Sequence, residues 1–187
     1  MVHAAIQIDA LMTGTVLAVL GIAVREDMLR QRIPNALNAS ALLLGIGLAS
    51  LIDGLRGLVD AAGGAAIGTA VLLPFYLLRG MGAGDVKLMA ATGSFLGCHD
   101  AITAGLLTLI AGFFLGIAFL VRHVAQALYR QPAAPSDEAM VAWRALATVL
   151  SLRRARFPYA LAIGVGVVAT LVLNGALAAF WGALWFR

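Results

Sequence analysis

Apolar runs separated by short polar stretches make up most of the sequence. A membrane-spanning helix needs about 20 apolar residues, and most of these runs approach or exceed that length. One run, at residues 85–96, is shorter, so we expect its first turn to lie within the membrane, shielded by protein. The pattern predicts an all-α polytopic membrane protein, a single membrane-embedded domain over residues 1–187 with six transmembrane helices. We expect these helices at about residues 6–24, 36–52, 58–78, 85–96, 101–121 and 157–186.

The longest polar stretch separates the last two runs and covers residues 122–156. We expect a loop here. Residues 137–154 mix apolar and charged positions around Trp143, which favours an amphipathic helix lying in the membrane interface. The first polar stretch, residues 25–35, contains Pro34, which suits the first turn of the following helix.

The composition agrees with a membrane protein. The chain is 62% hydrophobic and 12% charged, with a mean hydropathy of +0.97, whereas soluble domains carry about 25% charged residues. Cys98 is the only cysteine, which excludes an intramolecular disulfide and a cysteine zinc site. His3, His99 and His123 lack the spacing of metal ligands. We therefore expect neither a metal nor a cofactor.

The distribution of basic residues predicts the orientation in the membrane. No basic residue precedes an apolar core as it would in a cleavable signal peptide, so we expect a retained first helix. Six spans would place 11 of the 13 basic residues on one side, which the positive-inside rule makes cytoplasmic. Both termini are then outside. The net charge of +4 therefore indicates topology, and no nucleic-acid partner is expected. The 11 residues are Arg25, Arg30, Arg32, Arg79, Lys87, Arg122, Arg130, Arg144, Arg153, Arg154 and Arg156.

Asp85 follows a glycine-rich stretch, residues 80–84, and begins an apolar run. A carboxylate in or near lipid is costly and is a candidate functional group. The alternative is an acid that caps a helix in a solvated turn. Asp27 lies at the cytoplasmic end of the first predicted helix and so on the same side as Asp85. The remaining acids are on the outer side, in the 122–156 loop or, for Glu26, rotated by about 100° from Asp27.

Two adjacent carboxylates would provide the chemistry of an aspartyl peptidase. They cannot both ionise easily, so they share a proton near neutral pH. The ionised carboxyl activates water as a general base, and the protonated one polarises the scissile carbonyl. Glycines beside Asp85 would allow a peptide backbone to approach closely. Asp27 and Asp85 are therefore the candidate catalytic pair.

Three motifs resemble those of type IV prepilin peptidases, within the wider group of GxGD intramembrane aspartyl proteases. The first is Gly82-Ala83-Gly84-Asp85, followed by Val86-Lys87; the second is Asp27 with Ile33-Pro34-Asn35; the third is Pro158-Tyr159. The resemblance implies that Asp27 and Asp85 cleave the basic leader of prepilins or pseudopilins. It also implies a multi-pass protein of the bacterial inner membrane, with its active site near the cytoplasmic face.

Larger members of that family carry an added N-terminal region with paired cysteines, and they also methylate the new N-terminus. This chain begins at its first predicted helix and has one cysteine. The sequence therefore predicts a peptidase without methyltransferase activity, similar to the compact peptidases of tight-adherence or Flp pilus systems.

Several neighbouring residues are candidates for supporting roles. Lys87 either acts on Asp85 or on an acidic group of the substrate, or it extends from a helix end to the membrane surface. Pro34 and Asn35 are expected to shape the entry into the second helix, and Pro158 the entry into the last. Tyr159 is expected to shape the same entry or to hydrogen-bond near the aspartates. Gly82 and Gly84 complete the set of candidates.

Two other classes of function use the same features. A small transporter or channel would use the two aspartates to carry protons or cations. A non-enzymatic assembly factor would keep the fold without the chemistry. Replacement of either aspartate by asparagine separates these hypotheses from a peptidase.

Overall fold

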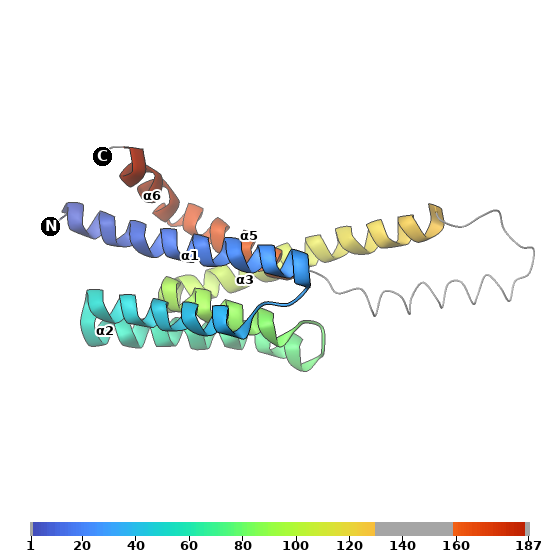
Figure 1. Ribbon diagram of the computed structural model, residues 1–187, viewed down its shortest axis with the longest axis horizontal. Coiled ribbons are helices and arrows are strands. Elements are labelled where there is room, and N and C mark those ends of the chain that lie inside the picture. Colours follow the sequence, from blue (N-terminus) through green and yellow to red (C-terminus); the bar gives the residue numbers. More distant parts are fainter. Residues whose placement is uncertain (1, 130–158, 186–187) are drawn as a thin grey trace, which may run out of the picture. The chain divides into compact units, whose positions relative to one another are not determined.

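The computed structural model describes residues 2–129 and 159–185, and every element within these ranges is a helix (Figure 1). This confirms the all-α prediction for the described residues. Two helical stretches, Asn35–Leu77 and Ala83–His123, are long and apolar enough to cross a membrane. The helices are α1 (Val2–Arg30), α2 (Asn35–Leu77), α3 (Ala83–Tyr129), α5 (Tyr159–Leu173) and α6 (Ala176–Trp185).

Each of the two long helices, α2 and α3, contains one glycine with non-helical geometry. Gly54 in α2 has φ 60°, and Gly97 in α3 has φ 76°, a left-handed conformation that only glycine adopts without strain. The chain reverses direction at these points, so each long helix is two segments joined at a kink (Figure 1). The sequence placed breaks between helices at these two positions.

Two boundaries differ from the sequence-based expectation. The expected last helix, residues 157–186, is instead interrupted between α5 and α6, where Gly175 has φ 71°. Residues 122–129, which we assigned to a loop, continue α3 as a helix. The end of an apolar run does not show where the helix itself ends, because a helix can continue into water. The amphipathic helix expected at residues 137–154 lies outside the described residues.

The structure divides into two compact units. Of the described residues, 2–112 and 159–185 belong to the first unit, and 113–129 belong to the second. In the second unit, the rings of Phe113 and Phe114 pack edge to face, and Phe119 stacks on His123. Both candidate aspartates belong to the first unit.

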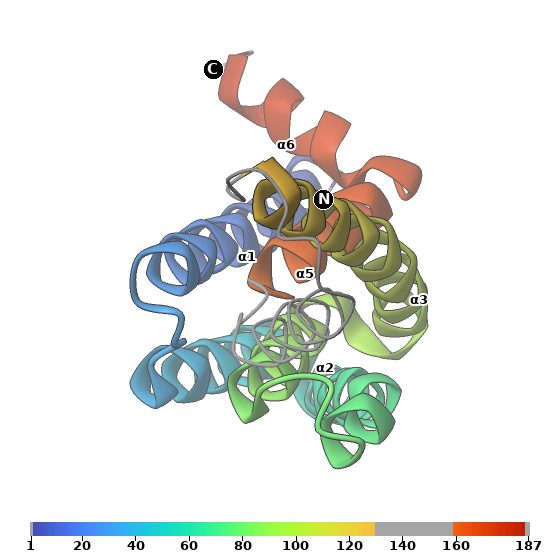
Figure 2. The same cartoon turned by 90° about the vertical axis from the view of Figure 1, so that its right-hand side faces the viewer.

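The first segment of α3 lies at the centre of the first unit, between α2 and α5 in the view along the helices (Figure 2). Leu88, Met89 and Ala91 on this segment are fully buried. Small residues allow α2 to approach closely, as in many membrane helix pairs. An added methyl at Gly64 or Gly93 would collide with the backbone carbonyl of the other residue.

On the other side of the unit, α1 packs along α5 and α6. A methyl on Gly14 would meet the ring of Phe180, and one on Gly164 would touch Val24. The end of α1, the start of α2 and the turn between α2 and α3 lie at the same end of the unit (Figure 1). The glycine kinks at Gly54 and Gly97 lie at the opposite end.

Candidate active site

Asp27 lies in the last two turns of α1, and its side chain is buried, with 7% of the residue exposed. Its Oδ2 accepts a hydrogen bond from the backbone N–H of Ala160, at a distance of 3.2 Å. Ala160 is in the first turn of α5, where N–H groups have no partner within the helix. Asp27 therefore provides an acceptor for the start of a helix 133 residues further along the chain.

Asp85 lies in the first turn of α3 and is also buried, with 9% of the residue exposed. Its Oδ2 accepts a hydrogen bond from the N–H of Gly82 at 3.1 Å, and its own N–H donates to the Gly82 carbonyl at 3.2 Å. This is the return half of a capping box, in which an acid reaches back to the start of its helix. The capping alternative is thus correct in geometry, but the turn is not solvated at the carboxylate.

The two carboxylates lie at the same end of the first unit, and the charge of Asp27 acts on Asp85. Each carboxylate uses Oδ2 to accept a backbone N–H, and among the described residues Oδ1 of neither accepts a hydrogen bond. The Oδ1 atoms are therefore the oxygens without a hydrogen-bond donor in the described part of the chain. Helix N-termini favour negative charge, so each aspartate lies where a carboxylate can be held despite burial.

Glu26, the neighbour of Asp27, has a different role. It forms ion pairs with Arg30 at 3.2 Å and with Arg25 at 3.5 Å. Arg30 is three residues from Asp27 and could reach it on the same helix face, but it pairs with Glu26, one helical turn away.

Two hydrogen bonds join the start of α2 to the turn that carries Asp85. Lys87 Nζ donates to Asn35 Oδ1 at 3.0 Å, which connects the proline-asparagine motif to the glycine-aspartate motif. Asn38 Nδ2 donates to the Gly84 carbonyl at 3.1 Å. Sequence reasoning missed Asn38, although its position one turn after Asn35, at the start of an apolar run, is a detectable signal.

The glycines and Pro34 shape the same turn. Pro34 precedes α2 with extended geometry, φ −60° and ψ 132°, and its carbonyl accepts the N–H of Asn38. A methyl on Gly82 would lie 3.3 Å from Asp85 Oδ2, so the carboxylate would have to shift slightly. A methyl on Gly84 would lie 3.5 Å from Ile33, an ordinary contact. Steric crowding by the rest of the protein therefore does not explain why position 84 is a glycine.

Tyr159 begins α5 and is half-buried. Its ring and hydroxyl pack against Gly112, and the charge of Asp85 acts on it. The structure thus brings Tyr159 to the site of the aspartates. Pro158, the other member of this motif, lies outside the described residues.

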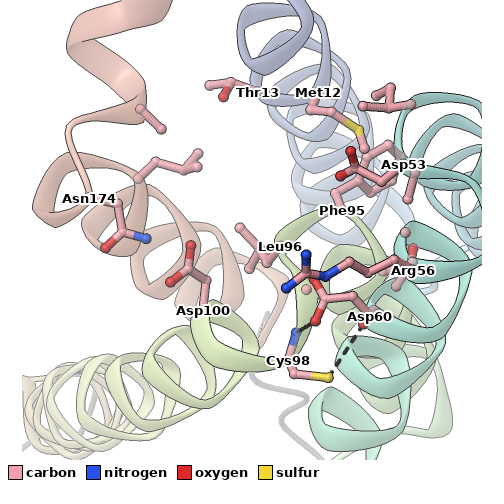
Figure 3. Close-up of a pocket in the computed structure, with 18 of the residues that line it drawn as sticks. Met12, Thr13, Asp53, Arg56, Asp60, Phe95, Leu96, Cys98, Asp100 and Asn174 are labelled. Atoms are coloured by element: carbon pink, nitrogen blue, oxygen red, sulfur yellow. Dashed lines mark hydrogen bonds between the residues drawn. The ribbon is translucent and has the colours of Figure 1, made fainter. Parts of the chain in front are cut away.

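A cavity of about 1080 Å³ lies at the opposite end of the first unit, beside the kinks at Gly54 and Gly97 (Figure 3). Neither Asp27 nor Asp85 is among the residues that line it. Asp60 at its wall accepts the N–H of Cys98 at 3.0 Å and so caps the helical segment after Gly97. Within the described residues no cluster of side chains has the make-up of a metal site. The cavity is lined by Asp53, Arg56, Asp60, Cys98, Asp100, Asn174 and several apolar residues.

Comparison with known proteins identifies the family. A model described as the type IV leader peptidase family matches residues 15–121, a range that contains both aspartates. The prepilin leader peptidase/N-methyltransferase of Aeromonas hydrophila is 36% identical over 102 residues. The match covers 51% of this chain and 35% of that protein. No solved structure matches the chain. Because the family model covers more than half of the sequence, including the first two of the three motifs, the chain belongs to the type IV leader peptidase family, whose members are polytopic membrane proteins.

Proposed function

We propose that this protein is an intramembrane aspartyl endopeptidase that removes the leader of type IV prepilins or pseudopilins. The proposal is supported by the burial of Asp27 and Asp85, two carboxylates from different helices at the same end of the first unit, where the charge of Asp27 acts on Asp85. Membership of the leader peptidase family supports this reaction, and the relative in Aeromonas hydrophila bears the corresponding name.

The two carboxyl groups divide the work of hydrolysis. With one proton shared between them, the ionised group removes a proton from water, and the water oxygen adds to the scissile carbonyl carbon. The protonated group donates to the carbonyl oxygen. Collapse of the tetrahedral intermediate breaks the C–N bond, and the leaving amine takes a proton from the pair. The titration behaviour belongs to both groups together, so either aspartate can serve as the base.

The site is proposed to face the cytoplasm from the bacterial inner membrane. In this proposal α1 supplies one crossing, and α2 and α3 supply two each. The sixth crossing is α5 and α6 together, and both termini are outside. The concentration of 11 of the 13 basic residues on one side supports this orientation. It would present Asp27 and Asp85 to the basic leader where that leader enters the membrane. Only the peptidase reaction is assigned to this chain, in keeping with its single cysteine.

Isosteric replacement of the aspartates tests the proposal. Co-expression with a prepilin, read by the size shift on leader loss and by the mass of the new N-terminus, should show complete processing by the wild-type protein. Asp27→Asn and Asp85→Asn should each abolish processing while the protein remains in the membrane. Asp60→Asn, at the opposite end of the unit, is the matched control. Normal processing by either asparagine variant would exclude the two-carboxylate mechanism.

Transport of protons or cations by the same aspartates is the alternative function. It predicts flux in proteoliposomes that the wild-type protein supports and that Asp85→Asn abolishes. The peptidase proposal predicts no flux above that of empty liposomes, so the same two proteins distinguish the functions.

A further inference from the structure

Asn38 joins the start of α2 to the residue that precedes Asp85. Only 3% of Asn38 is exposed, and its Nδ2 donates to the Gly84 carbonyl at 3.1 Å, across 46 residues of sequence. Burial of a polar amide at a helix start costs free energy unless its groups are hydrogen-bonded. The hydrogen bond to Gly84 therefore satisfies the donor group of this side chain, its NH₂.

The turn that carries Asp85 needs an external support. Its glycines at positions 80, 82 and 84 have no side chains with which to pack, and among the described residues the Asp85 carboxylate accepts a hydrogen bond only from Gly82. A hydrogen bond from Asn38 to the carbonyl next to Asp85 restricts where the carboxylate lies. Catalysis is sensitive to displacements of about 1 Å, which can lower a rate on the order of 100-fold.

The acceptor group of the same carboxamide, Oδ1, has no such partner in the described part of the chain. Asn38 Oδ1 is buried and has no hydrogen-bond partner among the described residues. The orientation of the amide follows from its neighbour, because an oxygen facing the Gly84 carbonyl would be repelled and only the NH₂ group can donate to it. An acceptor beside the catalytic turn is thus left for a donor that the described residues do not supply.

An extended peptide supplies such a donor. Its backbone N–H groups must find acceptors when it leaves water to approach Asp85, and unsatisfied groups would weaken its binding. At Gly84, which Asn38 contacts, an added methyl would meet Ile33 at the ordinary contact distance of 3.5 Å, so crowding by the protein does not require a glycine there. The side chain that holds the Gly84 carbonyl is thus also the one with an unpaired acceptor.

We propose that Asn38 positions Asp85 through the Gly84 carbonyl and accepts, through Oδ1, a hydrogen bond from a backbone N–H of the bound substrate. This inference rests on the proposed peptidase function. It gives the two polar groups of one buried side chain separate tasks: Nδ2 holds the catalytic turn, and Oδ1 holds the peptide.

Two substitutions of similar size separate the tasks. Asn38→Leu removes both groups, whereas Asn38→Asp removes the donor and keeps oxygen acceptors. Asn174→Leu, at the exposed junction between α5 and α6, is the matched control. For each purified protein we would measure kcat and KM with a prepilin, thermal unfolding in detergent, and deuterium uptake of the peptide covering residues 80–88.

Faster deuterium exchange at residues 80–88 is expected in both Asn38 variants, together with a lower kcat, on the order of 100-fold for Asn38→Leu. KM should rise about tenfold or more in Asn38→Leu and stay within about twofold of wild type in Asn38→Asp. The added charge of Asn38→Asp also acts on kcat, so the acceptor role is judged from KM alone. If Asn38→Leu does not fold, exchange and KM of Asn38→Asp decide both roles.

Unchanged exchange and unchanged kcat in Asn38→Leu would overturn the positioning role. An equal rise of KM in both variants would overturn the acceptor role. These outcomes are distinct from failure of the proposed function, in which the wild-type protein cleaves no prepilin. In that case the link between Asn38 and Gly84 is still tested by the exchange measurement, which needs no substrate.

Discussion

The backbone N–H of Ala160 donates to Asp27 Oδ2 at 3.2 Å, so a candidate catalytic carboxylate is also the acceptor at the start of α5. Asp85 likewise is both a candidate catalytic carboxylate and an acceptor at a helix start, because it accepts the N–H of Gly82 at the start of α3. Both aspartates therefore contribute to the fold through one oxygen, while chemistry requires the other. Substitutions at these positions must be interpreted with both contributions in mind.

Asparagine and alanine at position 27 should differ in stability but not in activity. Asparagine keeps a side-chain oxygen that can accept the Ala160 N–H, whereas alanine leaves that group unpaired. We expect Asp27→Ala to lower the free energy of unfolding by about 1 kcal/mol relative to Asp27→Asn, and both to be inactive. Thermal unfolding in detergent and prepilin processing check the two effects. Equal stability of the two variants would show that the bond to Ala160 contributes nothing.

Alanine substitutions in the glycine-rich turn should separate substrate approach from carboxylate placement. The methyl of Gly84→Ala meets Ile33 at an ordinary contact distance, and alanine favours helix over glycine. We expect unchanged or raised stability and a rise in KM of about tenfold, because the methyl occupies space left for the peptide. The methyl of Gly82→Ala presses on Asp85 Oδ2, so this variant should mainly lower kcat. Steady-state kinetics on both variants make the comparison, and a wild-type KM in Gly84→Ala would argue against substrate passing over Gly84.

The sequence predicted those parts of the structure that depend on local signals. The apolar runs located the helices, and Gly54 and Gly97 fall where the runs are interrupted. Counting basic residues put Asp27 and Asp85 on one side, and the structure places them at one end of a compact unit. The orientation in the membrane stays a prediction, which rests on the asymmetry of basic residues that the positive-inside rule describes.

Contacts between distant segments were not predictable in this way. The partner of Asp27 is a backbone N–H 133 residues away, and any residue at position 160 except proline would supply it. The position of Asn38 one turn after Asn35 is a signal that was overlooked, but it does not indicate which carbonyl the side chain contacts. Lys87 was expected to act on Asp85 or on an acidic group of the substrate, or to extend to the membrane surface, and no local pattern indicated the hydrogen bond that it donates to Asn35.

The hydrogen bond between Lys87 and Asn35 should contribute modestly and only as a pair. Both residues are exposed, and such a bond adds about 1 kcal/mol or less. We expect Lys87→Met and Asn35→Ala each to lower stability by no more than this amount, and the double variant to lose no more than one single variant. A double-mutant cycle on the free energy of unfolding measures the coupling. Additive losses would mean that the two side chains act independently.

The close crossing of α2 and α3 predicts a large effect from a small substitution far from the chemistry. Gly93→Ala places a methyl against the Gly64 backbone carbonyl, and a backbone atom cannot move aside as a side chain can. We expect a loss of about 1–3 kcal/mol in the free energy of unfolding and lower activity, because α3 also carries Asp85. Gly47→Ala in α2 has open space around the new methyl and should be neutral or stabilising. Comparable stability of the two alanine variants would show that the helices can separate at this crossing without cost.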